Sequence, residues 1–214
     1  MRRVCLLGLT IAIGLAIGVG VFVTIQPVTP PSFEWAVHTG DTFQYEVRIH
    51  GVYPNMGSIS PEMFQRILDL NGTAIVANVT YLPLLSNTVN SSSFFASIVN
   101  VSKVVCTFGN GSAIDSDLHA IVASAISGCT HPIGGWSYID SLYPDEMPGY
   151  AGGRFIAAKL YPDHFYFAHS ETFIDSIEKC SANVTLSNGV PSSVQWMYKH
   201  QYWAIYIELA LVDS

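Results

Sequence analysis

The sequence predicts an α+β protein: an N-terminal transmembrane helix followed by a predominantly antiparallel β-sheet ectodomain, built as a meander or curved sheet. Three observations support this class. The chain begins with an uncharged apolar run, several later segments alternate apolar and polar residues, and one segment has the apolar spacing of an amphipathic helix. The predicted organisation is an anchor or signal segment at 1–26, a stalk at 27–32 and an extracytoplasmic sheet-rich domain at 33–214.

The apolar run extends from Val4 to Ile25 and follows Arg2 and Arg3. Its 22 residues reach about 33 Å as a helix, which is enough to cross a bilayer. Positive charges flanking a span remain on the cytoplasmic side, so a single-pass anchor would place the rest of the chain outside the cytoplasm. The run exits without an Ala-x-Ala cleavage site, which favours a retained anchor over a cleaved signal, the alternative.

The polar segments of the ectodomain carry an excess of N-glycosylation motifs. The motif Asn-x-Ser/Thr occurs at six of the nine asparagines, namely Asn71, Asn78, Asn90, Asn100, Asn110 and Asn183. Because only one or two are expected by chance in a chain of this composition, we expect a glycosylated surface. The alternative is that a Ser/Thr/Asn-rich β protein accumulates such motifs by composition.

Charge and cysteine content limit the partners of the ectodomain. Without Arg2 and Arg3 it has 7 basic and 16 acidic side chains, a net charge of 7 − 16 = −9. This argues against nucleic acid and against docking on anionic lipid heads, so the predicted partners are the membrane, through the N-terminal helix, and a lipid or protein. Three cysteines, Cys106, Cys129 and Cys180, are disulfide candidates of unknown pairing.

The first half of the ectodomain predicts strands and one hairpin. Apolar Phe43, Tyr45, Val47 and Ile49 alternate with polar neighbours, so this segment is a strand with one buried face. Asn71-Gly72 favours a tight hairpin between strands at 64–70 and 73–81, over the alternative of a helix from Pro61 to Leu70 that Gly72 caps. The β-branched residues of 94–108 predict a further strand.

The second half predicts one clear helix and a C-terminal meander. Ser112 or Asp115 caps the helix, Gly128 ends it, and the apolar stripe includes Leu118 and Val122. The Asp115-x-Asp117 pair suits a helix start better than a calcium loop. The remaining expectations are an irregular segment at 130–153 with a short helix near 137–142, a short helix at 154–160, a strand at 164–169, a hairpin of 180–186 with 190–199, and a last strand at 201–211.

We find no catalytic motif in the sequence. It contains no Gly-x-Ser-x-Gly, Walker A, G-x-G-x-x-G or His-Glu-x-x-His pattern, and its seven histidines are scattered, so no catalytic residue, metal or cofactor is predicted. One alternative remains in the long loop, where Asp140, Asp145 and Glu146 lie near tyrosines. Paired carboxylates beside aromatic residues are typical of glycoside hydrolases.

Five aromatic residues gather in the C-terminal hairpin: Trp196, Tyr198, Tyr202, Trp203 and Tyr206. If the sheet curves, one face of it would line an apolar groove for a lipid or another hydrophobic ligand. The alternative is a sheet core with cross-strand aromatic pairs.

Two short motifs resemble a known class of proteins. The segment Trp35-Ala-Val37-His-Thr-Gly40-Asp41-Thr-Phe43-Gln-Tyr45 resembles the W-x-V-x-x-G-D-x-F-x-Y strand that opens a class of archaeal membrane-anchored or secreted surface proteins. The later Ser-Asn-Gly189-Val-Pro191 turn resembles their C-terminal hairpin. That class has no assigned reaction, so the resemblance implies a location and a β-rich fold only.

The expected function is therefore that of a single-pass, glycosylated surface protein that acts by binding or as an envelope component. Two alternatives are a curved-sheet carrier of a hydrophobic ligand and an extracytoplasmic hydrolase that uses the carboxylates of the long loop.

Overall fold

The computed structural model describes residues 32–50, 61–85, 90–147, 153–172, 176–200 and 203–212. These belong to one compact unit that spans 31–214. The predicted anchor at 1–26 lies outside the described residues, as does nearly all of the predicted stalk. Within the ranges given above, no helix has the length and apolarity needed to cross a membrane.

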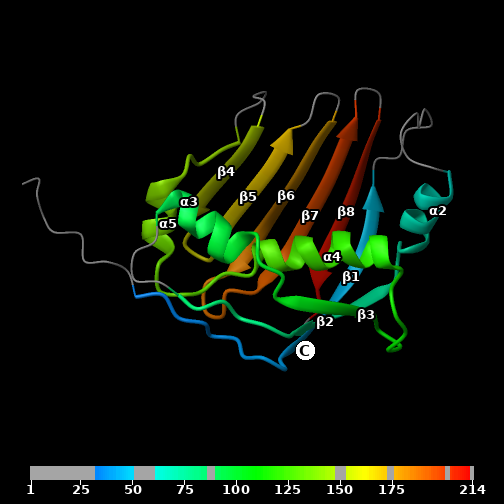
Figure 1. The fold of residues 1–214 in the computed structure, drawn as a ribbon, viewed down its shortest axis with the longest axis horizontal. Coiled ribbons are helices and arrows are strands. Elements are labelled where there is room, and N and C mark those ends of the chain that lie inside the picture. The colour runs from blue at the N-terminus through cyan, green and yellow to red at the C-terminus, as the bar shows by residue number, and fades with distance from the viewer. Residues whose placement is uncertain are drawn as a thin grey trace, which may run out of the picture. The chain divides into compact units, whose positions relative to one another are not determined.

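The core of the fold is a single antiparallel sheet in the order β3-β2-β1-β8-β7-β6-β5-β4, which confirms the predicted α+β class with an antiparallel sheet (Figure 1). Two meanders, β1 to β3 and β4 to β8, join because β1 pairs with β8. The strands are β1 (Thr42–His50), β2 (Ala74–Val79), β3 (Val104–Phe108), β4 (Gly153–Leu160), β5 (His164–Thr172), β6 (Ser176–Thr185), β7 (Pro191–His200) and β8 (Trp203–Leu211).

Helices cover one face of this sheet, and two of them connect the two meanders (Figure 1). The longest, α4, contacts β3, β6 and β7, whereas α5 contacts β4. The helical elements are α2 (Pro61–Asp69), α3 (Ser91–Phe94), the π-helix η1 (Phe95–Val99), α4 (Ser116–Cys129) and α5 (Trp136–Leu142). The face under these helices is called the covered face, and the other the open face.

The alternation predicted for the first strand is confirmed. Tyr45 and Val47 are fully buried on the covered face, while Glu46 and Arg48 are exposed on the open face. The same two faces, one buried and one exposed, continue across the sheet, because Val47 pairs with Leu209, which is also fully buried. Side chains of successive residues point to opposite faces, so the apolar core forms between the covered face and the helices.

The start of α4 is where the sequence predicts it. Asp115 is the N-cap, and its Oδ1 accepts a hydrogen bond from the backbone N of Asp117 at 3.2 Å. A carboxylate at this position satisfies a free backbone donor and interacts favourably with the helix dipole. The helix continues one residue beyond the predicted Gly128 end, to Cys129.

The hairpin predicted around Asn71-Gly72 is wrong, and the alternative helix is correct. Pro61–Asp69 forms α2, with Ile67 buried on one side, and the chain turns at Gly72 with φ of +76°. A helix wins because its amphipathic spacing buries Ile67 and Leu70 together.

Two further assignments are wrong. Only the end of 94–108 is a strand, because Asn90 begins a helical segment: its Oδ1 accepts from the backbone N of Ser93 at 2.9 Å. Conversely, the helix predicted at 154–160 is strand β4, which pairs along its length with β5. The short helix predicted near 137–142 and the hairpin of β6 with β7 are confirmed.

Candidate functional site

A groove lies beside η1 and β4. It has a volume of about 610 Å³ and is lined mostly by apolar side chains. Ligand pockets commonly measure roughly 300–1,000 Å³ and have such linings. The lining residues are Ser92, Phe95, Ala96, Tyr143, Pro144, Glu146, Arg154, Phe155 and Ile156.

Two consecutive phenylalanines set one wall of the groove. Phe94 is fully buried and stacks on the His131 ring with centroids 5.6 Å apart. Phe95, the first residue of η1, is only half-buried and lines the groove. Since successive helical side chains point about 100° apart, fixing Phe94 in the core directs Phe95 toward the groove.

Two charged side chains line the groove, Glu146 and Arg154, and an ion pair neutralises Arg154. The Arg154 guanidinium lies over the Phe95 ring, 4.4 Å from its centroid, and forms an ion pair with Glu171 on the neighbouring strand. The cation–π contact and the ion pair hold this long side chain along the groove wall. Apolar surface and a paired charge together favour an apolar ligand over a free anion.

The segment from Asp140 to Glu146 forms the opposite wall and is fixed to the edge of β4. The carbonyl oxygen of Pro144 accepts from the backbone N of Ala158 at 3.0 Å, and Asp140 Oδ1 accepts from that of Leu160 at 2.8 Å. These bonds satisfy donors that an edge strand would leave open. Burial raises the pKa of Tyr143, in this wall, to about 12.

The carboxylates considered for a hydrolase have different partners. Asp140 binds the backbone of β4, and Asp145 forms an ion pair with Lys159 at 2.7 Å. Glu146 lines the groove. Covering the β4 edge accounts for Asp140 and Asp145, so the geometry assigns them a structural role.

The aromatic set predicted to line a groove does not share one face. Trp196 and Tyr198 lie on the covered face, where Trp196 is buried and donates from Nε1 to Glu178 Oε1 at 2.8 Å. Tyr206 lies on the open face, because its neighbours Ile205 and Ile207 are the buried residues of β8. The side chains of Tyr202 and Trp203 lie outside the described part. The groove of the structure is instead formed by η1 and β4, and no pattern in the sequence indicates that these two elements meet.

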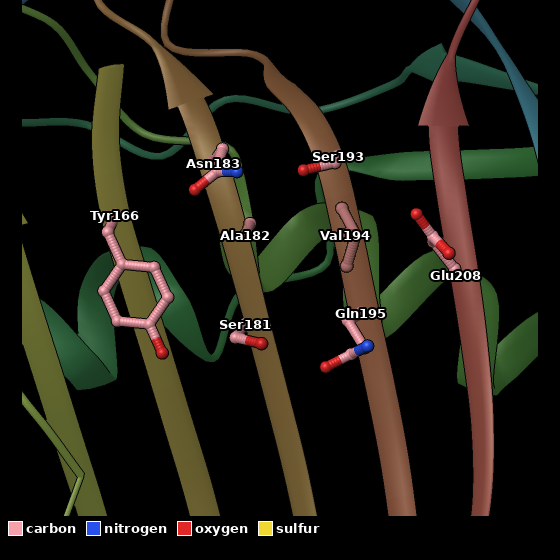
Figure 2. A pocket seen from close by; sticks show the side chains of 8 residues that line it. All are labelled: Tyr166, Ser181, Ala182, Asn183, Ser193, Val194, Gln195 and Glu208. Carbon is pink, nitrogen blue, oxygen red and sulfur yellow. The ribbon is translucent and has the colours of Figure 1, made fainter. Parts of the chain in front are cut away.

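A second, smaller hollow of about 240 Å³ lies on the open face. Figure 2 shows polar side chains from β5 to β8 projecting on the same side of the sheet, with α4 behind it. They are Tyr166, Ser181, Asn183, Ser193, Gln195 and Glu208. Asn183 is also one of the predicted glycosylation sites.

All six asparagines of the glycosylation motifs are exposed. In three of them the side chain is oriented by its oxygen: Asn71 Oδ1 accepts from Ile49, Asn90 Oδ1 from Ser93 and Asn110 Oδ1 from Ser112. These bonds use the amide oxygen and leave the amide nitrogen, to which a glycan is attached, outside the bonds named. The exposure meets the steric requirement for the predicted modification.

The three disulfide candidates are buried free thiols. The Sγ atoms of Cys129 and Cys180 lie 3.5 Å apart, at the end of α4 and on β6. Cys106 lies on β3, and burial raises the pKa of its thiol to about 12.

Sequence reasoning missed a buried lysine. Lys103 is 0 % exposed, and its Nζ donates to the carbonyl oxygens of Ile98, at the end of η1, and Ser127, near the end of α4. It thereby satisfies carbonyls that helix ends leave free. Burial lowers its pKa to about 7. The feature of the sequence that corresponds to this burial is a single lysine within an apolar run rich in β-branched residues.

Comparison with known proteins adds no relative: no protein-family model matches the chain, and no curated protein or solved structure matches it. The functional argument therefore rests on the geometry described above.

Proposed function

We propose that the protein is an N-terminally anchored, extracytoplasmic binding protein that holds one small hydrophobic molecule in the groove beside η1 and β4. The observation that carries this proposal is the groove itself, with its volume of about 610 Å³ and its apolar lining. The proposal makes the expected function, a surface protein that acts by binding, more specific. It also places the ligand site in this groove and not at the C-terminal aromatic hairpin.

The groove has the features expected of a binding site for an apolar ligand. Its walls come from a strand whose edge is bonded to the opposite wall, so it is preformed and needs little reordering on binding. Phe95 and Ile156 offer apolar surface, and Ile156 lies on the strand floor beside η1. The only basic group of the lining, Arg154, is already paired with Glu171.

The extracytoplasmic location is supported by the sequence and by exposure. The apolar run at 4–25 would anchor the chain, and all six motif asparagines are accessible to glycosylation. A glycan on Asn183 would occupy the hollow of the open face, so this hollow is a poor choice for the ligand site.

The test is native mass spectrometry of the full chain, extracted in detergent from a glycosylating host. We expect a glycosylated protein that carries an additional apolar molecule, released on denaturation, whose mass identifies it. A protein that carries no adduct and takes up no fluorescent fatty acid or other apolar dye would refute the ligand-binding proposal. Absence of glycans and of residues 1–26 would instead refute the retained anchor and the glycosylation.

Two neighbouring substitutions on η1 locate the site. Ala96 is exposed and lines the groove, whereas Ser97 is equally exposed and is not part of the lining. Ala96→Trp should fill the groove and abolish dye binding, and Ser97→Trp should leave binding unchanged. If both variants lost dye binding, or both retained it, the ligand would bind elsewhere.

A further inference from the structure

A second site lies beneath the end of α4, where three potential metal ligands meet. They are the Sγ atoms of Cys129 and Cys180 and a ring nitrogen of His169, all within 4.8 Å of one another. They come from α4, β6 and β5 respectively. His169 and Cys180 are direct cross-strand partners, so the sheet register itself places them side by side.

His169 shares one feature with the buried His131, which is a ring nitrogen without a hydrogen-bond partner among the described residues. Its Nε2 is enclosed and has no hydrogen-bond partner among the described residues. A buried polar atom without a partner destabilises the folded state, and such atoms are rare in folded proteins. A neutral imidazole nitrogen is a common metal ligand in proteins.

The backbone beside this nitrogen leaves room for a ligand. A Cβ on Gly128 would lie 3.0 Å from His169 Nε2, so a larger residue at this position would crowd that nitrogen. Gly128 precedes Cys129 in the last turn of α4, where a helix gains no conformational advantage from glycine. An open position next to Nε2 accounts for it.

We propose that Cys129, Cys180 and His169 bind one zinc-like divalent cation through two thiolates and one imidazole. Two cysteines and one histidine form a ligand set that zinc uses in proteins, with the fourth position taken by water or left to another ligand. Zinc carries two positive charges and would neutralise two thiolates, so the buried site would have no net charge. Binding through sulfur requires release of any thiol proton, because the thiolate is the form that ligates zinc.

A disulfide between Cys129 and Cys180 is the competing outcome. The sulfur atoms are 3.5 Å apart, and two electrons and two protons would leave them for an oxidant such as a thiol–disulfide exchange protein. A disulfide would occupy both sulfurs but leave His169 Nε2 enclosed without a partner. A metal ion coordinated by Nε2 would give this nitrogen a partner and bind both sulfurs, so the proposal takes Nε2 as the ligand atom of His169.

The test uses the full chain, extracted in detergent and kept reduced without oxygen, with Co²⁺ as a spectroscopic probe for Zn²⁺. We expect one equivalent of Co²⁺, sulfur-to-cobalt charge-transfer absorption, displacement by Zn²⁺ and a higher melting temperature with Zn²⁺. Cys180→Ser and His169→Gln should lose this spectrum. Cys106→Ser, a buried cysteine outside the cluster, should keep it and serves as the matched control.

Gly128→Ala provides a variant that keeps every ligand. It should weaken Zn²⁺ binding on the order of tenfold, as changes next to metal ligands often do. The proposal is overturned if Co²⁺ gives no charge-transfer band, if the band survives in Cys180→Ser, or if peptide mapping of natively extracted protein shows a Cys129–Cys180 disulfide.

Discussion

The covered face of the sheet has two ends that are built differently. At the packed end, near β1, β3 and the end of α4, Tyr45 and Lys103 are fully buried, and each polar atom reaches a backbone carbonyl. At the groove end, beside η1 and β4, side chains such as Phe95 are only half-buried and surround a volume of about 610 Å³.

The difference shows how one sheet can combine stability with an open site. The packed end encloses apolar surface and satisfies helix ends internally, which stabilises the fold. The groove end keeps its edge strand bonded through Pro144 and Asp140, so it remains open without an unpaired edge. Substitutions at the packed end should therefore reduce stability, and those at the groove end should reduce binding.

Phe94 and Phe95 test this comparison most strongly, because they are adjacent residues of the same type. Phe94→Ala removes a fully buried ring that contacts His131, Tyr143 and Phe167. We expect it to lower the free energy of unfolding by about 3–5 kcal/mol. Phe95→Ala should cost clearly less, since its ring is partly exposed, but it should weaken binding of an apolar dye. Urea denaturation and dye titration of both variants measure the two effects.

Equal losses of stability in the two variants would mean that the groove end is as tightly packed as the rest. Unchanged dye binding in Phe95→Ala would mean that the ring does not contact the ligand.

Lys103 is the next test, with Lys159 as its control. Lys103→Met leaves the carbonyl oxygens of Ile98 and Ser127 without their donor, while removing the cost of burying an amine. We expect a net loss of about 2 kcal/mol in the free energy of unfolding, from about 1–3 kcal/mol per unsatisfied group. Lys159→Met breaks an exposed pair with Asp145 and should cost much less, because water screens ion pairs at the surface.

These values are checked by urea denaturation at fixed pH and ionic strength. A Lys103→Met variant as stable as the parent would show that solvent or a rearranged backbone replaces the lost donor.

The sequence predicts local features of this fold well where one periodicity dominates. The alternation in 42–50 and the Asp115-capped helix are confirmed because burial on one side selects those residues directly. The segment 64–70 is mispredicted because Asn71-Gly72 suits a hairpin and a helix end equally, and tertiary burial of Ile67 decides between them. The helix predicted at 154–160 is wrong because pairing with β5 outweighs its local preference.

The two sites were beyond prediction for a different reason. The groove joins η1 to β4, and the thiol–imidazole cluster joins residues 129, 169 and 180, so neither leaves a local spacing pattern. The sequence supplied three cysteines without their pairing. Only the β5–β6 register and the position of α4 bring Cys129 and Cys180 to His169.

The dependence of stability on pH sharpens the comparison further. Burial lowers the pKa of Lys103 to about 7 in the folded chain, from 10.5 when exposed. Between these values the unfolded chain binds more protons, so the free energy of unfolding should rise with pH, by at most about 1.4 kcal/mol per pH unit. Above pH 9 the opposite effect begins, because the buried Cys106 thiol keeps its proton to about pH 12 in the folded state alone.

The useful window is therefore pH 7 to 9, measured by urea denaturation at constant ionic strength. Lys103→Met should abolish the rise, whereas Lys159→Met, whose lysine is exposed, should retain it. If the free energy of unfolding of Lys103→Met still rose with pH, another titratable group would be responsible for the rise. No rise in the parent chain would mean that the carbonyl oxygens of Ile98 and Ser127 stabilise the charged amine enough to offset its burial, which would make Lys103 a permanent buried cation at the packed end.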